Sequence, residues 1–300
     1  MGESTDLSRS APEEIVNLAS QLGSNFRITQ GPGGNVSMKE LGVLWVKASG
    51  TQMAMAKQKT IFVPVDLEDA QEKIRLGSVD FISLNPHSSL RPSIETAMHA
   101  LIASPFVAHV HSLGSLSVSA LKNITAAQVA KGICEITVIP YVKPGIELAK
   151  CIQSSLVTES SALLLGNHGL TVWGNGPSEC ERLISELEIA WREAIPKTTK
   201  EYDNEWIDIL LGGALFPDEI VFLGNESFSS NLSAANIFEL LTDTGLQKVK
   251  KTPWLEDFLK VLEEVARSGI KLEEMRYLTA IECNELLNWD AEKFRSSQVE

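Results

Sequence analysis

Apolar residues recur at helical spacing in several parts of the chain. Ser10 followed by Glu13 forms a capping-box pattern, and apolar residues at positions 15, 18, 19 and 22 then predict a short amphipathic helix. A longer helix is predicted over 178–194, between prolines at positions 177 and 196. Ser93 favours the start of another helix with apolar residues at 94, 97, 98, 101 and 102. Glu95 is therefore expected in the first turn of that helix.

Shorter runs indicate strands. Residues 35–39 and 43–48 flank Gly42 and predict a β-hairpin. The apolar runs at 106–111 and 161–165 predict two further strands, and polar residues that include histidine follow or end each run. Strands and helices are mixed without strict alternation, which favours an α/β or α+β sandwich.

The region beyond about residue 200 has secondary-structure patterns but no cluster of catalytic residue types. A segment at 206–211 and a strand-like run at 219–223 precede amphipathic helices near 254–267 and 272–287. We therefore expect one chemical domain over residues 1–200. A mainly helical C-terminal extension over 201–300 is expected to pack on the same core.

Composition narrows the classes of partner. The chain has 300 residues, 44% of them hydrophobic, which is enough for a sizeable core. Its net charge of -13 would repel nucleic acid and anionic lipid at long range. No apolar stretch reaches the roughly 18 to 20 residues that span a bilayer, and the first residues lack a signal pattern, so we expect a cytoplasmic location with neither nucleic acid nor membrane as partner. An anionic substrate would need a locally positive pocket.

Histidines supply the first candidate chemistry. His109 and His111 lie two apart in a predicted strand, so both imidazoles project from one face and could bind one ion. His168 follows a separate strand and could add a third ligand. Each feature alone has a structural explanation: a His-x-His pair is often polar strand surface, and Glu95 suits a helix N-terminus. His99, one helical turn beyond Glu95, is expected to be structural or to support a ligand.

Two glycine-containing loops are candidates for phosphate binding. The loop at 31–34 is followed by a strand pattern and lacks the lysine of a nucleotide-binding P-loop, which excludes that assignment. Backbone amides near Asn35 and in the loop at 48–51 could form a small anion nest. Ordinary turns explain the same residues equally well.

Five motifs taken in order resemble the class II aldolase/adducin family. They are Gly33-Gly34-Asn35-Val36-Ser37, Lys47-Ala48-Ser49-Gly50-Thr51, Pro92-Ser93-Ile94-Glu95, His109-Val110-His111 and Asn167-His168-Gly169. Within the family, the chain most resembles the aldolase part of bifunctional rhamnulose-1-phosphate aldolase/alcohol dehydrogenase proteins. That likeness adds the segments at 45–50, 91–95, 216–219 and 287–293 and covers nearly the whole chain.

The resemblance implies a fold and a set of site residues. The expected fold is a three-layer α/β/α sandwich around a mostly antiparallel sheet, usually in a homotetramer. By family match the metal site, for Zn2+ or another divalent ion, consists of His109, His111 and His168, which Glu95 can approach. Glu95 would be the catalytic acid and base, with a pKa raised by a water-poor pocket. The expected phosphate-binding residues are Asn35, Ser49, Gly50 and Ser93, and Tyr141 is the candidate proton donor to the aldehyde oxygen.

The implied activity is that of a class II, metal-dependent aldehyde-lyase in carbohydrate metabolism. A divalent ion can stabilise negative charge on a substrate oxygen as a carbon–carbon bond breaks. We expect reversible cleavage of a 6-deoxy-ketohexose 1-phosphate to dihydroxyacetone phosphate and a small aldehyde. The alternatives are a sugar-phosphate 4-epimerase or dehydratase on the same scaffold, or a non-catalytic, adducin-like assembly module.

Overall fold

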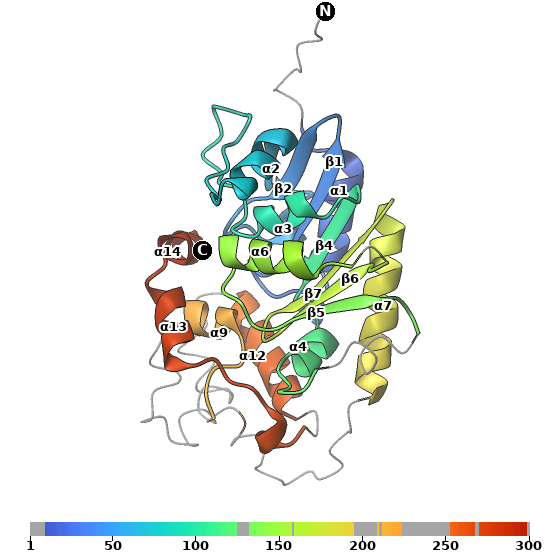
Figure 1. The fold of residues 1–300 in the computed structure, drawn as a ribbon, viewed down its shortest axis with the longest axis vertical. Coiled ribbons are helices and arrows are strands. Elements are labelled where there is room, and N and C mark those ends of the chain that lie inside the picture. The colour runs from blue at the N-terminus through green and yellow to red at the C-terminus, as the bar shows by residue number, and fades with distance from the viewer. Residues whose placement is uncertain are drawn as a thin grey trace, which may run out of the picture.

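A seven-stranded sheet lies at the centre of the protein, for which we analyse a computed structural model (Figure 1). The structure describes residues 10–124, 132–157, 159–194, 209, 212–223, 253–267 and 270–298. The strands are β1 (Asn35–Glu40), β2 (Val43–Lys47), β3 (Phe62–Asp66), β4 (Phe106–Val110), β5 (Ile136–Ile139), β6 (Ala162–Leu165) and β7 (Gly169–Gly174). Their order is β3-β2-β1-β4-β7-β6-β5, and every described pair except β5–β6 is antiparallel. The predicted hairpin at 35–48 is confirmed as β1 and β2.

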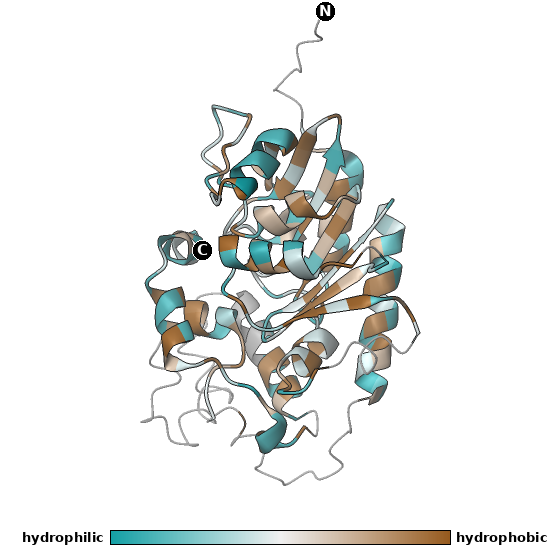
Figure 2. Ribbon diagram, in the orientation of Figure 1, coloured by the Kyte–Doolittle hydropathy of each residue, from teal (hydrophilic) through white to brown (hydrophobic). Residues whose placement is uncertain are grey.

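Helices cover both faces of the sheet, which confirms the three-layer α/β/α sandwich (Figure 1). The helices around the sheet are α1 (Glu13–Gly23), α2 (Leu67–Arg75), α3 (Thr96–Leu101), α4 (Leu113–Ser119), α6 (Ile146–Ser155) and α7 (Pro177–Ala194), with a short 3-10 helix η1 (Met53–Met55). α1 and α7 pack on one face, and α2, α3 and α6 pack on the other. Figure 2 shows apolar residues gathered along the strands that these helices cover.

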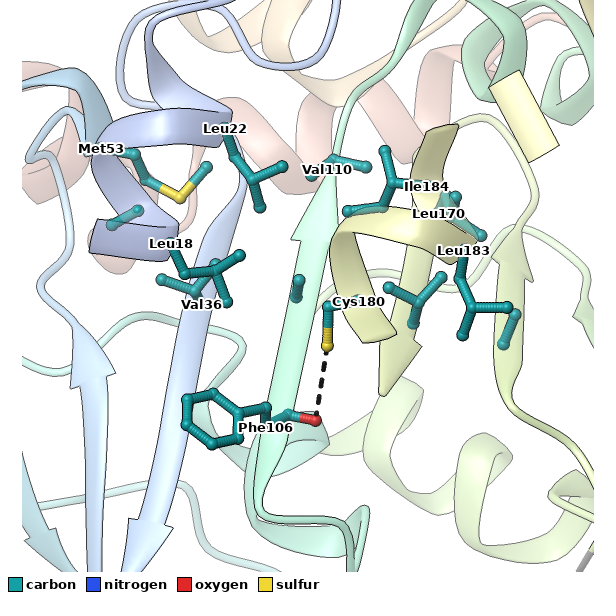
Figure 3. Packing of buried hydrophobic residues seen from close by; sticks show 14 of the residues in the cluster. Leu18, Leu22, Val36, Met53, Phe106, Val110, Leu170, Cys180, Leu183 and Ile184 are labelled. Carbon is teal, nitrogen blue, oxygen red and sulfur yellow. Dashed lines mark hydrogen bonds between the residues drawn. The ribbon is translucent and has the colours of Figure 1, made fainter. Parts of the chain in front are cut away.

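Alternation along β4 decides which side chains reach which layer. Ala108 and Val110 point into the core beneath α1 and α7, where Val36 and Leu183 also lie (Figure 3). Residues of the opposite parity, such as Val107, face the α3 and α6 layer. His109 shares that parity, so the strand pattern sends it toward α3 rather than into the α1 and α7 core.

The C-terminal region contributes further helices, one of which packs against α4. They are α9 (Pro217–Leu223), α12 (Pro253–Ala266), α13 (Ala280–Leu287) and α14 (Asp290–Ser297), with a 3-10 helix η3 (Leu272–Glu274). Leu113 and Leu116 of α4 share a buried apolar cluster with Phe216, Val261 and Val265. The extension is therefore joined to the sandwich through a hydrophobic interface (Figure 1). Within the described ranges, no helix combines the length and apolar character needed to cross a membrane.

Two predictions about helix starts were wrong. Ser10 and Glu13 do not form a capping box: α1 begins at Glu13, and Pro12 precedes it without a side-chain cap. Glu95 is the N-cap of α3 rather than a residue of its first turn. The backbone N–H of Thr96 donates to the carbonyl of Ser93, so a turn precedes the helix and moves its N-cap from Ser93 to Glu95.

Two further predictions in the C-terminal region were wrong. The strand-like run at 219–223 belongs to helix α9, because a proline at the first helical position and acidic residues in the first turn favour a helix over the apolar strand pattern. The helix predicted over 272–287 is interrupted. Met275 pairs with Leu121 in an isolated bridge, and a capping box between Thr279 and Glu282 starts α13 afresh. The segment predicted at 206–211 lies outside the described residues apart from Ile209.

Candidate metal centre and active site

The three predicted histidine ligands come together at neighbouring strand ends. His109 lies in β4, His111 follows its last residue, and His168 lies in the tight turn between β6 and β7. Each is nearly inaccessible to solvent, and one ligand atom from each ring lies within 4.8 Å of the others. Asn167 holds the turn in a left-handed conformation with φ 51°, and its side-chain amide donates to the Leu215 carbonyl at 2.9 Å. The fold therefore assembles a group that could hold a metal ion.

Hydrogen bonds fix how two of these imidazoles are protonated. His109 Nδ1 lies 3.1 Å from the carbonyl oxygen of Leu170 and 3.0 Å from Thr171 Oγ1. A carbonyl only accepts, so Nδ1 carries the proton and donates it. His111 Nδ1 lies 3.0 Å from Asp218 Oδ2 and donates to that carboxylate. In its neutral form each ring therefore presents the lone pair of Nε2 to the other ring at the centre of the cluster.

This arrangement fits a cation. The Nε2 atoms of His109 and His111 lie 3.1 Å apart, so two lone pairs face each other. Protonation would relieve the repulsion, but burial lowers the pKa of His109 well below its ordinary value and that of His168 to about 4. Neutral, buried imidazoles are the form that ligates divalent metals. A bound cation would satisfy both lone pairs without charging either ring.

Glu95 directs one oxygen into the same space. Its Oε1 lies 3.4 Å from His109 Nε2 and 3.2 Å from His168 Nε2, and it has no hydrogen-bond donor within the described part of the chain. Asn35 Nδ2 donates to Oε2 at 2.6 Å. Burial raises the pKa of Glu95, but electrostatic interactions with His109, His168 and His111 and the hydrogen bond from Asn35 outweigh that effect and lower the pKa to about 2. The expected rise in pKa was therefore wrong, and the group is a carboxylate at neutral pH.

A buried hydrogen-bond chain supports Glu95 from behind. His99 Nε2 donates to Asn35 Oδ1, and His99 Nδ1 lies 2.7 Å from Ser37 Oγ. Burial lowers the pKa of His99 to about 3, so its ring is neutral and Nδ1 accepts from the serine. This order of donors turns the Asn35 amide nitrogen toward Glu95. His99 thus has the supporting position that its helical spacing from Glu95 indicated.

The residues predicted to surround a phosphate lie on two adjoining segments. Asn35 Nδ2 lies 3.2 Å from Ser93 Oγ, next to Glu95. Ser49 and Gly50 lie on the neighbouring loop, which is tied to the segment at 91–93 through the Ser49 N–H and the Arg91 carbonyl at 2.9 Å. The hydroxyl of Ser49 is buried and has no partner among the described residues. Their role in phosphate binding stays a prediction.

Lys47 is a buried cation beneath these loops. Its ammonium donates to the carbonyls of Pro32 and Thr51 at 3.0 and 2.6 Å, so it joins the two glycine-containing loops. Burial, and then the charge of Arg295, lower its pKa to about 7. The Lys47 amine is therefore only partly protonated near neutral pH, and an anion bound at these loops would favour its charged form.

The structure also places two residues at the site that the sequence analysis missed. Besides its contact with His111, Asp218 of α9 accepts from Arg295 Nη2 of α14 at 2.5 Å. Burial raises the pKa of Asp218, but Arg295 and His111 more than offset this and hold it below its ordinary value. Neither Asp218 nor Arg295 stands at a sequence spacing typical of metal ligands, so only the tertiary contacts show that they lie beside the histidines.

Tyr141 packs among residues of the C-terminal region. Its ring lies 5.0 Å from the guanidinium of Arg276 and contacts an apolar cluster that includes Leu278 and Leu286. Its hydroxyl is buried without a hydrogen-bond partner in the described structure. Burial raises the pKa of this phenol above its ordinary value. Its role as a proton donor stays a prediction.

Comparison with known proteins identifies a family that matches the chain and proteins that are similar to it. The family described as "Class II Aldolase and Adducin N-terminal domain" matches residues 13–195. The chain is 31% identical over 200 residues to the uncharacterized oxidoreductase YuxG of Bacillus subtilis (strain 168), a match that covers 59% of this chain but only 29% of that protein. It is 28% identical over 145 residues to methylthioribulose-1-phosphate dehydratase of Bacillus pumilus (strain SAFR-032), covering 39% and 68% of the two chains.

A solved structure agrees with the fold. The N-terminal class II aldolase domain of a conserved protein from Thermoplasma acidophilum superposes with a TM-score of 0.53 at 25% identity, covering 65% of this chain and 97% of that one. The family match spans more than half of the 300 residues and includes all three clustered histidines and Glu95. The chain therefore belongs to the class II aldolase and adducin family.

Proposed function

We propose that the chain is a metal-dependent aldolase that reversibly cleaves a phosphorylated ketose, of the 6-deoxy-ketohexose 1-phosphate type, to dihydroxyacetone phosphate and a small aldehyde. One observation carries the proposal. Three buried imidazoles converge with a carboxylate oxygen that lacks a hydrogen-bond donor among the described residues. Such a set suits metal-assisted proton transfer next to a carbonyl better than it suits a packing role.

We assign the metal to His109, His111 and His168, with Zn2+ or another divalent ion. When bound, the ion would stabilise negative charge on the substrate oxygens as the carbon–carbon bond breaks or forms. Neutral imidazole ligands leave that positive charge undiminished. The burial of the histidines excludes bulk water, which strengthens electrostatic interactions at the site.

Glu95 is assigned the proton transfer. Its Oε2 is held by Asn35, while Oε1 faces the cluster and is free to take a proton. As a carboxylate at neutral pH, Glu95 can accept a carbon-bound proton in the condensation direction and return it during cleavage. Tyr141 is proposed to protonate the aldehyde oxygen, and its raised pKa suits a donor that keeps its proton at neutral pH.

The phosphate of the substrate is assigned to Asn35, Ser49, Gly50 and Ser93. Backbone amides of the loop at 48–51 and the buried Ser49 hydroxyl are suitable donors to an anion. The Lys47 ammonium beneath the loop supplies positive charge that counters the overall charge of -13.

We further propose that the chain is most similar to the aldolase part of bifunctional rhamnulose-1-phosphate aldolase/alcohol dehydrogenase proteins. The match to a much longer relative named as an oxidoreductase is compatible with that assignment. We also propose a cytoplasmic enzyme of carbohydrate metabolism that forms a homo-oligomer, with a tetramer favoured. Its proposed partner is a small phosphorylated sugar, with neither nucleic acid nor membrane as a partner.

The test combines metal content with product formation. Purified wild-type protein and the His109→Ala variant are analysed for bound metal and incubated with rhamnulose 1-phosphate or fuculose 1-phosphate while dihydroxyacetone phosphate is assayed. His87→Ala is the matched control, because His87 is exposed on a loop. We expect about one ion per chain and activity in the wild type and the control, with both lost in His109→Ala. A metal-free, inactive wild type would refute the proposal and favour an adducin-like assembly module.

A second candidate is a dehydratase, or a 4-epimerase, on the same metal scaffold. The similarity to methylthioribulose-1-phosphate dehydratase is the observation that favours a dehydratase. A dehydratase would release water from a ketose phosphate and yield no dihydroxyacetone phosphate. Analysis of the products by mass spectrometry therefore separates these reactions: a loss of 18 mass units identifies dehydration, two smaller products identify cleavage, and an isomer identifies epimerisation.

A further inference from the structure

The candidate ligands differ in which part of the chain holds them. His109 is fixed through Nδ1 by Leu170 and Thr171 of the neighbouring strand β7, within the range that matches the family. His111 is fixed through Nδ1 by Asp218, at 3.0 Å. Asp218 lies in α9, beyond residue 195, where the family match ends. The orientation of one ligand therefore depends on the C-terminal region.

Asp218 is itself held on its other oxygen. Arg295 Nη2 donates to Oδ1 at 2.5 Å, and Arg295 Nε donates to Glu292 Oε2 at 2.6 Å. These three side chains are all buried, so each charge has a partner where water is excluded. The result is a continuous chain of contacts from His111 through α9 to α14. In Figure 1 these two helices lie beside α13.

The first glycine-containing loop leaves room for this contact. A Cβ atom added at Gly33 would lie 2.9 Å from Asp218 Oδ2 and 2.9 Å from His111 Nδ1. A larger residue at this position would push apart the two atoms that form the hydrogen bond. The loop at 31–34 thus has a steric role at the centre even though it is not a nucleotide-binding loop.

We propose that the C-terminal region completes the metal centre, with Asp218 as the positioning residue that fixes the ring orientation and tautomer of His111 and Arg295 as the residue that fixes Asp218. The inference rests on the proposed function only in that the three histidines bind a metal. A carboxylate that accepts from the remote nitrogen of a histidine orients the ring and makes the ligating nitrogen more basic. Metal affinity should therefore depend on residues of α9 and α14.

A purely structural role is the competing explanation. In that case the Asp218 and Arg295 pair would only anchor α14, and its removal would change stability without changing metal affinity. The two explanations predict different dissociation constants for metal in folded Asp218 variants: a positioning role predicts a higher constant, and a purely structural role predicts an unchanged one. Activity alone does not separate them, since a loosened fold would also lower turnover.

The experiment measures Zn2+ affinity by competition with a chromophoric chelator, and records the visible absorption of the Co2+-loaded protein. Asp218→Ala should weaken Zn2+ binding about 10- to 100-fold, as is typical when the partner of a ligating histidine is removed. Asp218→Asn keeps an acceptor without the charge, so its loss should be smaller. The Co2+ spectrum of Asp218→Ala should shift, because His111 is no longer held in one orientation.

A double variant guards against misfolding. Asp218→Ala leaves Arg295 without one of its buried partners, so the single variant can lose stability for that reason alone. Asp218→Leu combined with Arg295→Met removes both charges and keeps similar volume, and the remaining Glu292 carboxyl, whose pKa burial already raises, can take up a proton when Arg295 is absent. The double variant should fold, confirmed by circular dichroism, and still bind Zn2+ about 10- to 100-fold more weakly. Glu188→Gln is the matched control, because Glu188 is a buried carboxylate that accepts from Gly114 N–H and forms no hydrogen bond or ion pair with a histidine among the described residues.

The outcomes separate this inference from the proposed function. Folded Asp218 variants that bind Zn2+ within twofold of the wild type, with an unchanged Co2+ spectrum, would overturn the inference. An equal loss of affinity in Glu188→Gln would also overturn it, since the effect would then reflect general destabilisation. A wild type that binds no metal would overturn both proposals. A wild type that binds metal but forms no dihydroxyacetone phosphate would refute the aldolase assignment and leave the inference standing.

Discussion

Gly50 offers a quantitative test of how the C-terminal helix α14 packs against the candidate phosphate loop. The residue has φ +77°, and a Cβ atom added there would lie 2.5 Å from Gln298 Cβ and 3.1 Å from the carbonyl oxygen of Arg295. Gly50→Ala should therefore be destabilising for two separate reasons. One is the left-handed backbone conformation, and the other is collision with the end of α14.

Gly42 separates the two contributions. It has φ +80°, and a Cβ atom added there would meet nothing within 4 Å. Gly42→Ala should lower the free energy of unfolding by about 1–2 kcal/mol, the cost of placing an L-residue in the left-handed region. Gly50→Ala should show that loss plus about 1–3 kcal/mol from overpacking. At roughly 2–4 °C per kcal/mol, the two melting temperatures should differ by several degrees.

Thermal and urea denaturation of both variants measure this difference. Gln298→Gly removes the nearest colliding atom, so the Gly50→Ala and Gln298→Gly double variant should recover much of the steric part while the backbone part remains. Equal destabilisation by Gly42→Ala and Gly50→Ala would refute the packing of α14 on the loop. A double variant no more stable than Gly50→Ala would show that Gln298 is not the obstacle.

Three further predictions concern the site and its surroundings. Burial raises the pKa of Glu219 from 4.5 to about 8, so the folded protein keeps a proton that the unfolded chain releases. The free energy of unfolding should therefore fall as pH rises from about 4.5 to about 8. Urea denaturation at pH 5 and pH 8 should show a smaller fall for Glu219→Gln than for the wild type. An unchanged pH dependence in the variant would contradict the raised pKa of Glu219. Thr171→Val should weaken Zn2+ binding less than about tenfold, because the Leu170 carbonyl still accepts from His109. A larger loss would show that the Thr171 hydroxyl is the main acceptor for His109. Lys47→Met should leave metal content unchanged. It should accelerate amide hydrogen exchange in the loop at 48–51, because the hydrogen bond from the ammonium to the Thr51 carbonyl is lost. Unchanged exchange would show that the ammonium does not hold the loop.

Local pattern predicted the elements that carry the histidines. The two-residue period of a strand predicts that His109 and His111 point to the same side of the sheet. Turn residues and apolar spacing predict the hairpin and the long helix α7. The position of His168 beside them could not come from spacing. It depends on β7 pairing with both β4 and β6, which brings the turn at 166–168 to the end of β4. The family resemblance supplied that long-range relation.

The contacts of Asp218 lay beyond sequence reasoning for a different reason. The run directly after it, 219–223, has a strand-like apolar pattern, whereas Pro217 and two acidic residues start a helix there. Even with the correct helix, nothing in the sequence pairs an acidic residue of α9 with His111 or with an arginine of α14. Such pairing depends on how the C-terminal helices pack on one another and, through α12, on α4, with apolar residues that carry no chemical signal of their own.

The distribution of buried charge explains why this packing bears on function. Arg295 is neutralised by Asp218 and Glu292, so it adds little net positive charge for a substrate. Lys47 donates to backbone carbonyls and has no carboxylate within 4 Å among the described residues, so its protonated form could pair with an anion at the loop. The same acidic side chain that cancels Arg295 orients His111. The site thus places Lys47 beneath the candidate phosphate loop, while Arg295 acts through Asp218 to hold His111, a candidate metal ligand, in place.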